Sequence, residues 1–373
     1  MLSDGRPPKI LILGEARAVH AQRWAEYFSR QGWTVRWFSF PPIPDGVAAE
    51  ALDDSGLPKV LRILRAVGRV RALAAAFRPD IVSALFVPDY GWLATLARLR
   101  PLAVSAWGSD VLIGPGKSLL HRRRIRSVLQ QADYLFADAE ILRTRMEELG
   151  ARSETIGIIP LGVDDAWLEA GQRRSQSDSD KITVVCNRRQ EALYQVDVFV
   201  RAAIRLAHEQ PDRFRFVVIG NGSLHEDLVK QTQVGDAGDA IVFRDWLDPD
   251  ALRTEFSQAD IYVSPSSSDG TSVSLLEAMA AGCYPIVTAI PGNREWITSG
   301  DNGTLFPVGD VDALVQALRD AAADRAMRHA AQTVNRDLVT QRALWRNNMG
   351  DVARCMLDVI SRYPQVHQST GTP

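Results

Sequence analysis

Short apolar runs alternate with helical stretches along most of this 373-residue chain, and this alternation is what most limits its fold. In the first half, the run at 9–14 is followed by a helical segment at about 19–31, a turn at Gly32 and a second apolar run at 35–40. Buried strands separated by helices are typical of parallel sheets that helices cover on both faces. The sequence therefore predicts a doubly wound α/β architecture.

The same alternation restarts in the second half, so we expect two Rossmann-like domains facing each other across a cleft. Ligands of such sheets bind at the carboxyl ends of the strands, which would line that cleft. The expected parts are a first domain at 1–164, a polar linker at 165–180, a second domain at 181–337, a helix at 338–360 that can pack back on the first domain, and a loose tail at 361–373.

Charge and cysteine content exclude several classes of protein. The 43 Lys and Arg residues nearly balance the 45 Asp and Glu residues, so nothing favours nucleic acid as the main partner. The three cysteines are widely spaced and form no CxxC pattern, which argues against a disulfide framework or a zinc site and favours a reducing cytoplasm. No apolar stretch reaches the roughly 20 residues of a membrane span. We expect a cytoplasmic protein, free or attached to the inner face of the membrane.

The most informative passage, at 261–282, reads as a strand, a turn rich in Ser and Gly, and a helix. Gly270 permits close approach of a ligand, and Thr271 and Ser272 are natural N-caps. The first turn of a helix offers backbone amides and a partial positive charge. A diphosphate is therefore a suitable ligand for this helix start.

Two carboxylates would bracket that diphosphate. Asp269 precedes the helix and Glu277 lies within it, and ionised carboxylates accept hydrogen bonds from the hydroxyls of a sugar nucleotide. The alternative is that Asp269 caps the helix and Glu277 is an ordinary solvated residue.

The passage resembles the donor-binding signature of family 4 of the retaining glycosyltransferases, which have the GT-B fold. The resemblance rests on two acids eight positions apart and on EAMAAG from the second acid onward. In that family the first acid contacts hydroxyls of the donor sugar and the second contacts the ribose, which implies these roles for Asp269 and Glu277. The first acid is usually Glu, so Asp269 is one methylene shorter.

Further passages in the second half are similar to landmarks of the same family and follow the same order. They are GNG at 220–222, FRDWL at 243–247, ADIYVSPS at 259–266, PGNREW at 291–296 and NGTLF at 302–306, while IPLGVD at 159–164 resembles the interdomain junction. The resemblance covers most of the second domain and is weaker in the first.

The resemblance also implies an arginine that neutralises the diphosphate. Arg188 follows the strand at 182–186 and has the forked donors that suit phosphate, with Arg189 as the alternative and Asn221 of the GNG loop nearby on the donor side. The family's lysine a few residues later is replaced by Tyr194. Phosphate binding is then one cation short unless Arg189 or Arg17 compensates.

In the first half, WGSD at 107–110 resembles a family loop that often reads HGSD near the reacting sugar. Trp107 stands in place of the histidine and either stacks on a sugar or fills the core. Asp110 either bonds a substrate hydroxyl or caps the loop.

The opening loop of the chain supplies three more candidates. Gly14 stands where many relatives have paired glycines close to the diphosphate, and Arg17 follows it. His20 has a side chain that titrates near neutral pH and suits proton movement, with an ordinary surface or capping role as the alternative.

Two segments are strongly basic. Residues 59–78 carry six cations and no acid, and 121–126 reads HRRRIR. Basic amphipathic surfaces suit anionic membranes, and the alternative is a solvated helix face over a core stripe.

The resemblance implies a retaining transfer, without a metal or other cofactor, of a hexose or N-acetylhexosamine from a nucleotide diphosphate sugar to a glycan or lipid-linked acceptor. UDP is favoured by its frequency in the family. Asp269, Arg188 and Asp110 are the candidate catalytic residues. The alternatives are a non-hydrolysing sugar-nucleotide epimerase and a catalytically degenerate sugar-nucleotide-binding partner protein.

Overall fold

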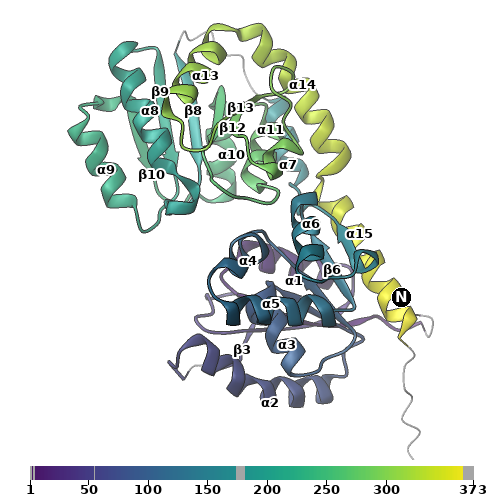
Figure 1. Cartoon of the computed structure of the whole chain (residues 1–373). Coiled ribbons are helices and arrows are strands. Elements are labelled where there is room, and N and C mark those ends of the chain that lie inside the picture. The colour runs from purple at the N-terminus through teal and green to yellow at the C-terminus, as the bar shows by residue number, and fades with distance from the viewer. Residues whose placement is uncertain (1, 3–4, 54, 174–180, 364–373) are drawn as a thin grey trace, which may run out of the picture. The chain divides into compact units, whose positions relative to one another are not determined.

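The structure, a computed structural model, describes residues 2, 5–53, 55–173 and 181–363, which form two compact units (Figure 1). Unit 1 comprises the chain up to Ile159 together with the residues from Met349 on, and unit 2 comprises Pro160–Asn348. Each unit is built on a parallel sheet with helices on both faces. The prediction of two doubly wound α/β domains is confirmed.

Unit 1 contains the elements of the first half of the chain. They are β1 (Lys9–Leu13), α1 (Val19–Arg30), β2 (Thr34–Ser39), β3 (Glu50–Ala51), α2 (Lys59–Phe77), β4 (Ile81–Leu85), α3 (Trp92–Leu96), β5 (Leu102–Ser105), α4 (Ser109–Leu112), α5 (Leu119–Gln131), β6 (Tyr134–Ala137), α6 (Glu140–Glu148) and β7 (Ile156–Ile158). Within the described residues the sheet has seven strands in the order β3-β2-β1-β4-β5-β6-β7.

The two faces of this sheet are covered by different helices. On one face, apolar residues of α2, α3, α5 and α6 pack in one cluster with alternate residues of the strands, such as Leu11 and Leu13. On the other face, Trp24 of α1 contacts the ring of Phe136, with centroids 6.0 Å apart. Both faces need a cover of helices because successive strand residues point to opposite sides and both sets are apolar here.

Unit 2 contains the remaining elements. They are α7 (Asp165–Gln172), β8 (Ile182–Asn187), α8 (Val196–Glu209), β9 (Phe214–Ile219), α9 (His225–Val234), β10 (Ile241–Arg244), α10 (Pro249–Gln258), β11 (Ile261–Ser264), α11 (Val273–Ala281), β12 (Tyr284–Thr288), α12 (Pro291–Arg294), β13 (Thr304–Phe306), α13 (Val311–Ala323), α14 (Arg325–Arg342) and the start of α15 (Trp345–Arg362).

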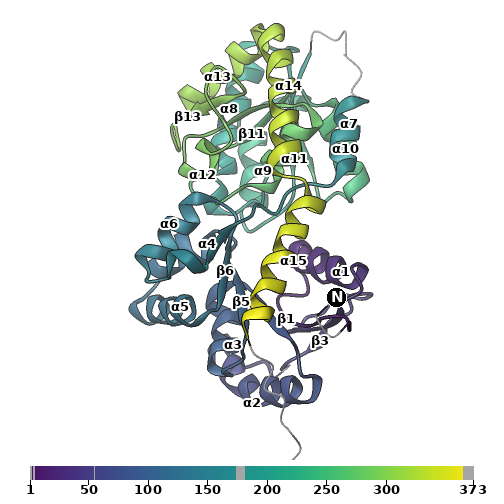
Figure 2. The ribbon, with the colours of Figure 1, turned by 90° about the vertical axis from the view of Figure 1, so that its right-hand side faces the viewer.

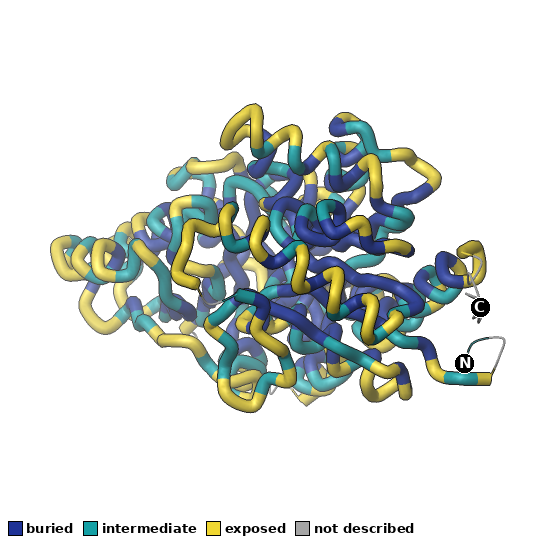
Figure 3. Tube along the Cα trace, turned by 90° about the horizontal axis from the view of Figure 1, so that it is seen from below, coloured by how far each residue is buried: buried dark blue, intermediate teal, exposed yellow. Residues whose placement is uncertain are grey.

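Within the described residues, the sheet of unit 2 has six parallel strands in the order β10-β9-β8-β11-β12-β13. One apolar cluster joins α8 and α13 to one face, and another joins α7, α10, α11 and α14 to the opposite face. Figure 3 shows buried and exposed residues following each other along the trace, as expected of helices that cover a sheet with one face. No helix in the described part of the chain is both long and apolar enough to cross a membrane.

The linker expected at 165–180 is wrong over its first half, because residues 165–172 form helix α7 of unit 2. Trp167 is 4% exposed and its ring lies 5.3 Å from that of Phe256. A Cβ on Gly171 would lie 2.3 Å from the carbonyl oxygen of Ala280, so α7 packs closely on α11. Residues 174–180 lie outside the described part of the chain.

The first boundary and the C-terminal helix also differ from expectation. The units divide after Ile159 rather than after 164, because Val163 exchanges backbone hydrogen bonds with Ala343 and Trp345 of unit 2. The helix expected at 338–360 is two helices, α14 and α15, which separate at Ala343.

From Met349 on, α15 belongs to unit 1. Tyr134 of β6 donates a hydrogen bond of 3.3 Å to the sulfur of Cys355, and Figure 2 shows α15 running beside α1. The tail expected at 361–373 is described only as far as residue 363.

Candidate functional site

The loops singled out by sequence in unit 2 leave the carboxyl ends of neighbouring strands. Gly220 follows β9, Arg188 follows β8, Asp269 follows β11, and Gly292 follows β12. Neighbouring strands lie about 4.8 Å apart, so these loops form a row along one edge of the sheet. The strands that follow β8 are added first on one side of it, as β9 and β10, and then on its other side, as β11 to β13. The gap between β8 and β11 is therefore the topological switch point where such sheets bind ligands.

Arg188 and Asp269, proposed separately as phosphate and sugar ligands, form an ion pair at this point. The guanidinium of Arg188 donates to the carboxylate of Asp269 and also to the hydroxyls of Ser272, at 2.6 Å, and Ser274, at 3.0 Å. The side chains of the pair are 9% and 20% exposed. Tyr194, which replaces the family's lysine, places its ring centre 4.5 Å from the guanidinium carbon.

The environment keeps Arg188 charged although it is nearly buried. Burial by itself lowers the pKa of Arg188, but the negative charge of Asp269, with the hydroxyls of Tyr262 and Tyr194, raises it above its usual value. The Nε atom of Arg188 is buried without a hydrogen-bond partner. A fixed, desolvated cation of this kind suits an anionic ligand.

Helix α11 begins and ends as its sequence predicts. Ser272 is the N-cap and accepts a hydrogen bond from the Leu275 amide at 3.4 Å, and Gly282 ends the helix in the left-handed conformation with φ of 84°. Thr271 is buried and accepts a hydrogen bond from the indole of Trp296 at 3.3 Å. Glu277, the proposed ribose ligand, lies partly buried on the same helix.

The turn before α11 is held by a close glycine contact. A Cβ on Gly292 would lie 2.2 Å from the carbonyl oxygen of Gly270, so only glycine lets the α12 loop reach the turn. The passages PGNREW at 291–296 and SSSDGTS at 266–272 are therefore in contact.

The GNG loop is fixed from two sides. A Cβ on Gly222 would lie 2.4 Å from the carbonyl oxygen of Gln190. Asn221 donates to the carboxylate of Asp245 at 3.0 Å and accepts the amide of Gly222 at 2.7 Å. Arg189, the alternative phosphate ligand, is exposed beside this loop.

Sequence reasoning missed Trp246 as a candidate ligand contact. Its side chain is 62% exposed, and its ring reaches within 3.8 Å of the Cβ position of Gly220. It belongs to the FRDWL passage, which was singled out only as a landmark. An exposed indole that follows β10, next to the GNG loop, was the available signal.

In unit 1, the carboxylate of Asp110 is buried and held by backbone amides, and its assignment as a candidate catalytic residue stays a prediction. It is 1% exposed, and its carboxylate accepts the backbone amides of Val87 at 3.2 Å, Trp107 at 3.1 Å and Val111 at 3.2 Å. Burial raises its pKa to about 6, although the amides oppose that rise. Asp110 ties the loop after β5 to the loop after β4.

His20 and Trp107 contact each other, with ring centroids 5.8 Å apart in an edge-to-face arrangement. Trp107 is partly buried, and neither its Nε1 atom nor Nδ1 of His20 has a hydrogen-bond partner. Burial, with the charge of Arg23, lowers the pKa of His20 to about 4. His20 is therefore neutral at pH 7, which differs from the expected near-neutral titration.

Gly14 and Arg17 have local structural contacts. A Cβ on Gly14 would lie 3.0 Å from Leu85, so the glycine allows close packing between the loop after β1 and strand β4. Arg17 is 61% exposed and pairs with Glu15 at 3.2 Å. Neither contact argues for or against a phosphate nearby.

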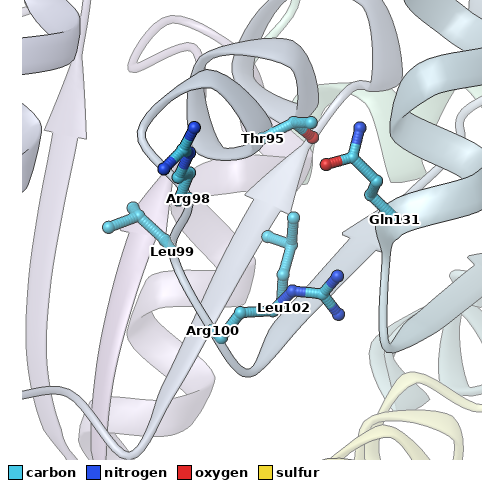
Figure 4. A pocket seen from close by; sticks show the side chains of 6 residues that line it. All are labelled: Thr95, Arg98, Leu99, Arg100, Leu102 and Gln131. Carbon is cyan, nitrogen blue, oxygen red and sulfur yellow. The ribbon is translucent and has the colours of Figure 1, made fainter.

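In the part of the chain that the structure describes, each unit contains a cavity. In unit 1 a cavity of about 200 Å³ opens at the amino end of β5, opposite the edge that carries Trp107 (Figure 4). Its lining residues are Thr95, Arg98, Leu99, Arg100, Leu102 and Gln131. In unit 2 a cavity of about 490 Å³ lies beside the carboxyl ends of β12 and β13 and includes Arg294 of α12. The described residues contain no group of three or more His, Cys, Asp or Glu side chains arranged to hold a metal.

Comparisons with known proteins find matches to both halves of the chain. Residues 169–337 match the family described as glycosyl transferases group 1, and residues 9–139 match the glycosyl transferase 4-like family. An amylovoran biosynthesis glycosyltransferase of Erwinia amylovora is 24% identical over 66% of this chain and 63% of its own length. A GDP-mannose-dependent phosphatidylinositol monomannoside mannosyltransferase of Mycolicibacterium smegmatis is 25% identical over 72% of this chain and 75% of its own length.

Solved structures show the same fold. A sucrose-phosphate synthase of Thermosynechococcus elongatus superposes with a TM-score of 0.82 at 17% identity, covering 95% of this chain and all of that one. HepE of Anabaena, in complex with UDP and glucose, gives a TM-score of 0.78 at 15% identity, covering 93% and 98%. With family matches in both halves and a shared fold, the chain belongs to the glycosyl transferases group 1 and has the GT-B fold.

Proposed function

We propose that the protein transfers a hexose or N-acetylhexosamine from a nucleotide diphosphate sugar to a glycan or lipid-linked acceptor, with retention of the anomeric configuration. The observation that carries this proposal is the cluster of Arg188, Asp269, Ser272 and Ser274 at the start of α11, at the switch point of unit 2. The two relatives named above act in amylovoran biosynthesis and on phosphatidylinositol monomannoside, which supports this range of acceptors.

In this proposal the chain binds the donor along the row of loops in unit 2. The diphosphate lies at the first turn of α11, where Arg188 stabilises the charge that grows as the sugar leaves. Asp269, held by Arg188, orients the sugar hydroxyls, and Glu277 binds the ribose. Trp246 stacks on the base. The departing diphosphate takes the proton of the acceptor hydroxyl, so no metal or other cofactor is required.

UDP is the nucleotide we propose first, on its frequency in the family. HepE of Anabaena was solved with UDP and glucose, whereas the mycobacterial relative depends on GDP-mannose, so both nucleotides belong in the test. We place the reaction in the cytoplasm, at the inner face of the membrane where lipid-linked acceptors are found.

The test is to incubate the protein with UDP- and GDP-sugars, with and without membrane lipid extracts or glycans. We expect release of nucleoside diphosphate only with an acceptor, and a product whose NMR spectrum shows the anomeric configuration of the donor. Epimerised donor in the absence of acceptor would favour the epimerase. Tight donor binding without product for any acceptor would favour a degenerate binding protein.

A further inference from the structure

The two basic segments of unit 1 are used differently. The arginines of α2 bond the chain around them: Arg62 donates to the carbonyl of Asp53 at 2.9 Å, and Arg69 to the carbonyl of Leu52 at 2.9 Å. Arg71 donates to Leu96, at the end of α3, at 2.8 Å. These cations hold unit 1 together, so most of the charge at 59–78 is not available to a partner.

Helix α5 is different. Arg122, Arg123 and Arg126 are exposed, and none forms an ion pair with any described residue. They share a face with Leu119, because residues three, four and seven positions apart lie on one side of a helix. Leu119 is 77% exposed and Leu120 is 59% exposed, so two adjacent leucines present apolar surface beside these arginines.

The charge on α5 is unfavourable for the isolated protein. No acid occurs between 114 and 131, and the cations gather in the first two turns, where the helix dipole is already positive. Burial and then the charge of Lys117 lower the pKa of His121, against the opposing charge of Asp89. A negatively charged partner would relieve this repulsion.

The position of α5 is also informative. It begins shortly after α4, in the connection that leaves the carboxyl end of β5, and this edge of unit 1 also carries Trp107 and Gly14. Leu57 and Leu61, near the start of α2, are 36% and 47% exposed. Exposed leucines therefore occur at the starts of both helices, on the side of unit 1 where an acceptor would arrive.

We propose that this α5 surface docks unit 1 on a bilayer that contains anionic lipid. The α5 surface is defined as Lys117, Leu119, Leu120, Arg122, Arg123 and Arg126. The leucines enter the boundary between headgroups and acyl chains, and the arginines pair with lipid phosphates. Exposed leucines beside the cations favour a bilayer over RNA, which would need the cations alone. The docking itself is independent of the proposed function, and only its purpose, delivery of a lipid-linked acceptor, rests on that function.

The test is flotation of the full-length protein with vesicles of phosphatidylcholine alone, or with a third of the lipid replaced by phosphatidylglycerol. The wild type is expected to bind only the anionic vesicles. Replacing Arg122, Arg123 and Arg126 together by Ser should weaken binding by about a hundredfold, at roughly fivefold for each arginine. Replacing Leu119 and Leu120 by Ser should weaken it by about tenfold or more.

A matched control removes three exposed arginines of unit 1 elsewhere, by Arg152→Ser, Arg354→Ser and Arg362→Ser, whose side chains are 62%, 77% and 71% exposed. This variant has the same net charge as the α5 arginine variant and should bind within about threefold of the wild type. Equal loss in both variants would mean that net charge alone matters and would overturn the proposal.

Equal binding of the wild type to both vesicle types, or unchanged binding of the α5 variants, would also overturn the proposal. If an α5 variant does not fold, the salt dependence of wild-type binding decides, because binding through free arginines must weaken steeply with salt. Donor binding by the α5 variants is expected to equal that of the wild type. A failure of the donor assignment would therefore be seen separately from a failure of docking.

Discussion

Arg188 is almost buried and charged, and its guanidinium donates hydrogen bonds to one carboxylate and two hydroxyls. Its removal would therefore leave Asp269 partly buried without a counter-charge. We expect Arg188→Ala to lower the free energy of unfolding by about 3 kcal/mol. The exposed pair of Arg201 and Asp197 on α8 is the control, and Arg201→Ala should cost less than about 0.5 kcal/mol. Urea unfolding measures both values, and equal costs would contradict the preorganised cluster.

A pH dependence follows from His20. Its pKa falls from 6.5 to about 4 on folding, so the stability it contributes is complete above pH 6.5 and is lost as pH falls toward 4. The full loss is about 3 kcal/mol at roughly 1.4 kcal/mol per pH unit. Asp110, whose pKa is raised to about 6, acts in the opposite direction between pH 4 and 6.

The variant His20→Leu separates the two contributions. It should gain stability as pH falls from about 6 to 4, because only the contribution of Asp110 remains, whereas the two opposed contributions nearly cancel in the wild type. Urea unfolding of both proteins between pH 4 and 7 gives the comparison. Parallel curves for the two proteins would show that His20 does not titrate as described.

At the scale of elements, the turn before α11 depends on one glycine. In Gly292→Ala the new methyl group would meet the carbonyl oxygen of Gly270, so either the α12 loop or the start of α11 must move. We expect destabilisation of about 1–3 kcal/mol together with weaker donor binding. The control is Gly68→Ala in the middle of α2, where a Cβ meets nothing within 4 Å.

That control should gain about 0.5–1 kcal/mol, because alanine favours the helix interior over glycine. Thermal unfolding with and without nucleotide compares the two variants. A Gly292→Ala protein that unfolds and binds nucleotide like the wild type would show that the turn is not held by this contact.

The elements also show what the sequence could and could not predict. Strands and helices were predictable where apolar periodicity is continuous and cap residues mark the ends, as Ser272 and Gly282 do for α11. Helix α7 was not, because its neighbours are polar and its anchor, Trp167, is buried by residues distant in the chain. The ion pair of Arg188 with Asp269 was not either, since 81 residues separate them and only the β8–β11 pairing brings them together.

At the scale of the whole molecule, the last helix returns to the first unit. Buried residues of α15 recur at helical spacing: Met349, Val352, Met356 and Val359. We expect Met356→Ala to destabilise unit 1 by about 2–4 kcal/mol through the cavity that it leaves. Hydrogen exchange should therefore accelerate in β1, β4 and β5, while the strands of unit 2 keep the rates of the wild type.

The exchange rates distinguish this account from one in which both units unfold together as a single cooperative core. Accelerated exchange in β8 and β11 equal to that in unit 1 would contradict the assignment of α15. The exposed residue Asp358 on the same helix supplies the control, and Asp358→Ala should leave both sets of rates nearly unchanged.

The central claim is that unit 2 binds the donor through Asp269 and Glu277, on either side of the start of α11. Calorimetric titration of the wild type with UDP- and GDP-sugars tests this claim most directly. The account predicts measurable binding of at least one of these donors, weakened about tenfold or more in Asp269→Ala and in Glu277→Ala. Glu226→Ala on α9, the control acid, should bind that donor like the wild type. Unchanged affinity in both the Asp269→Ala and Glu277→Ala variants would contradict the account.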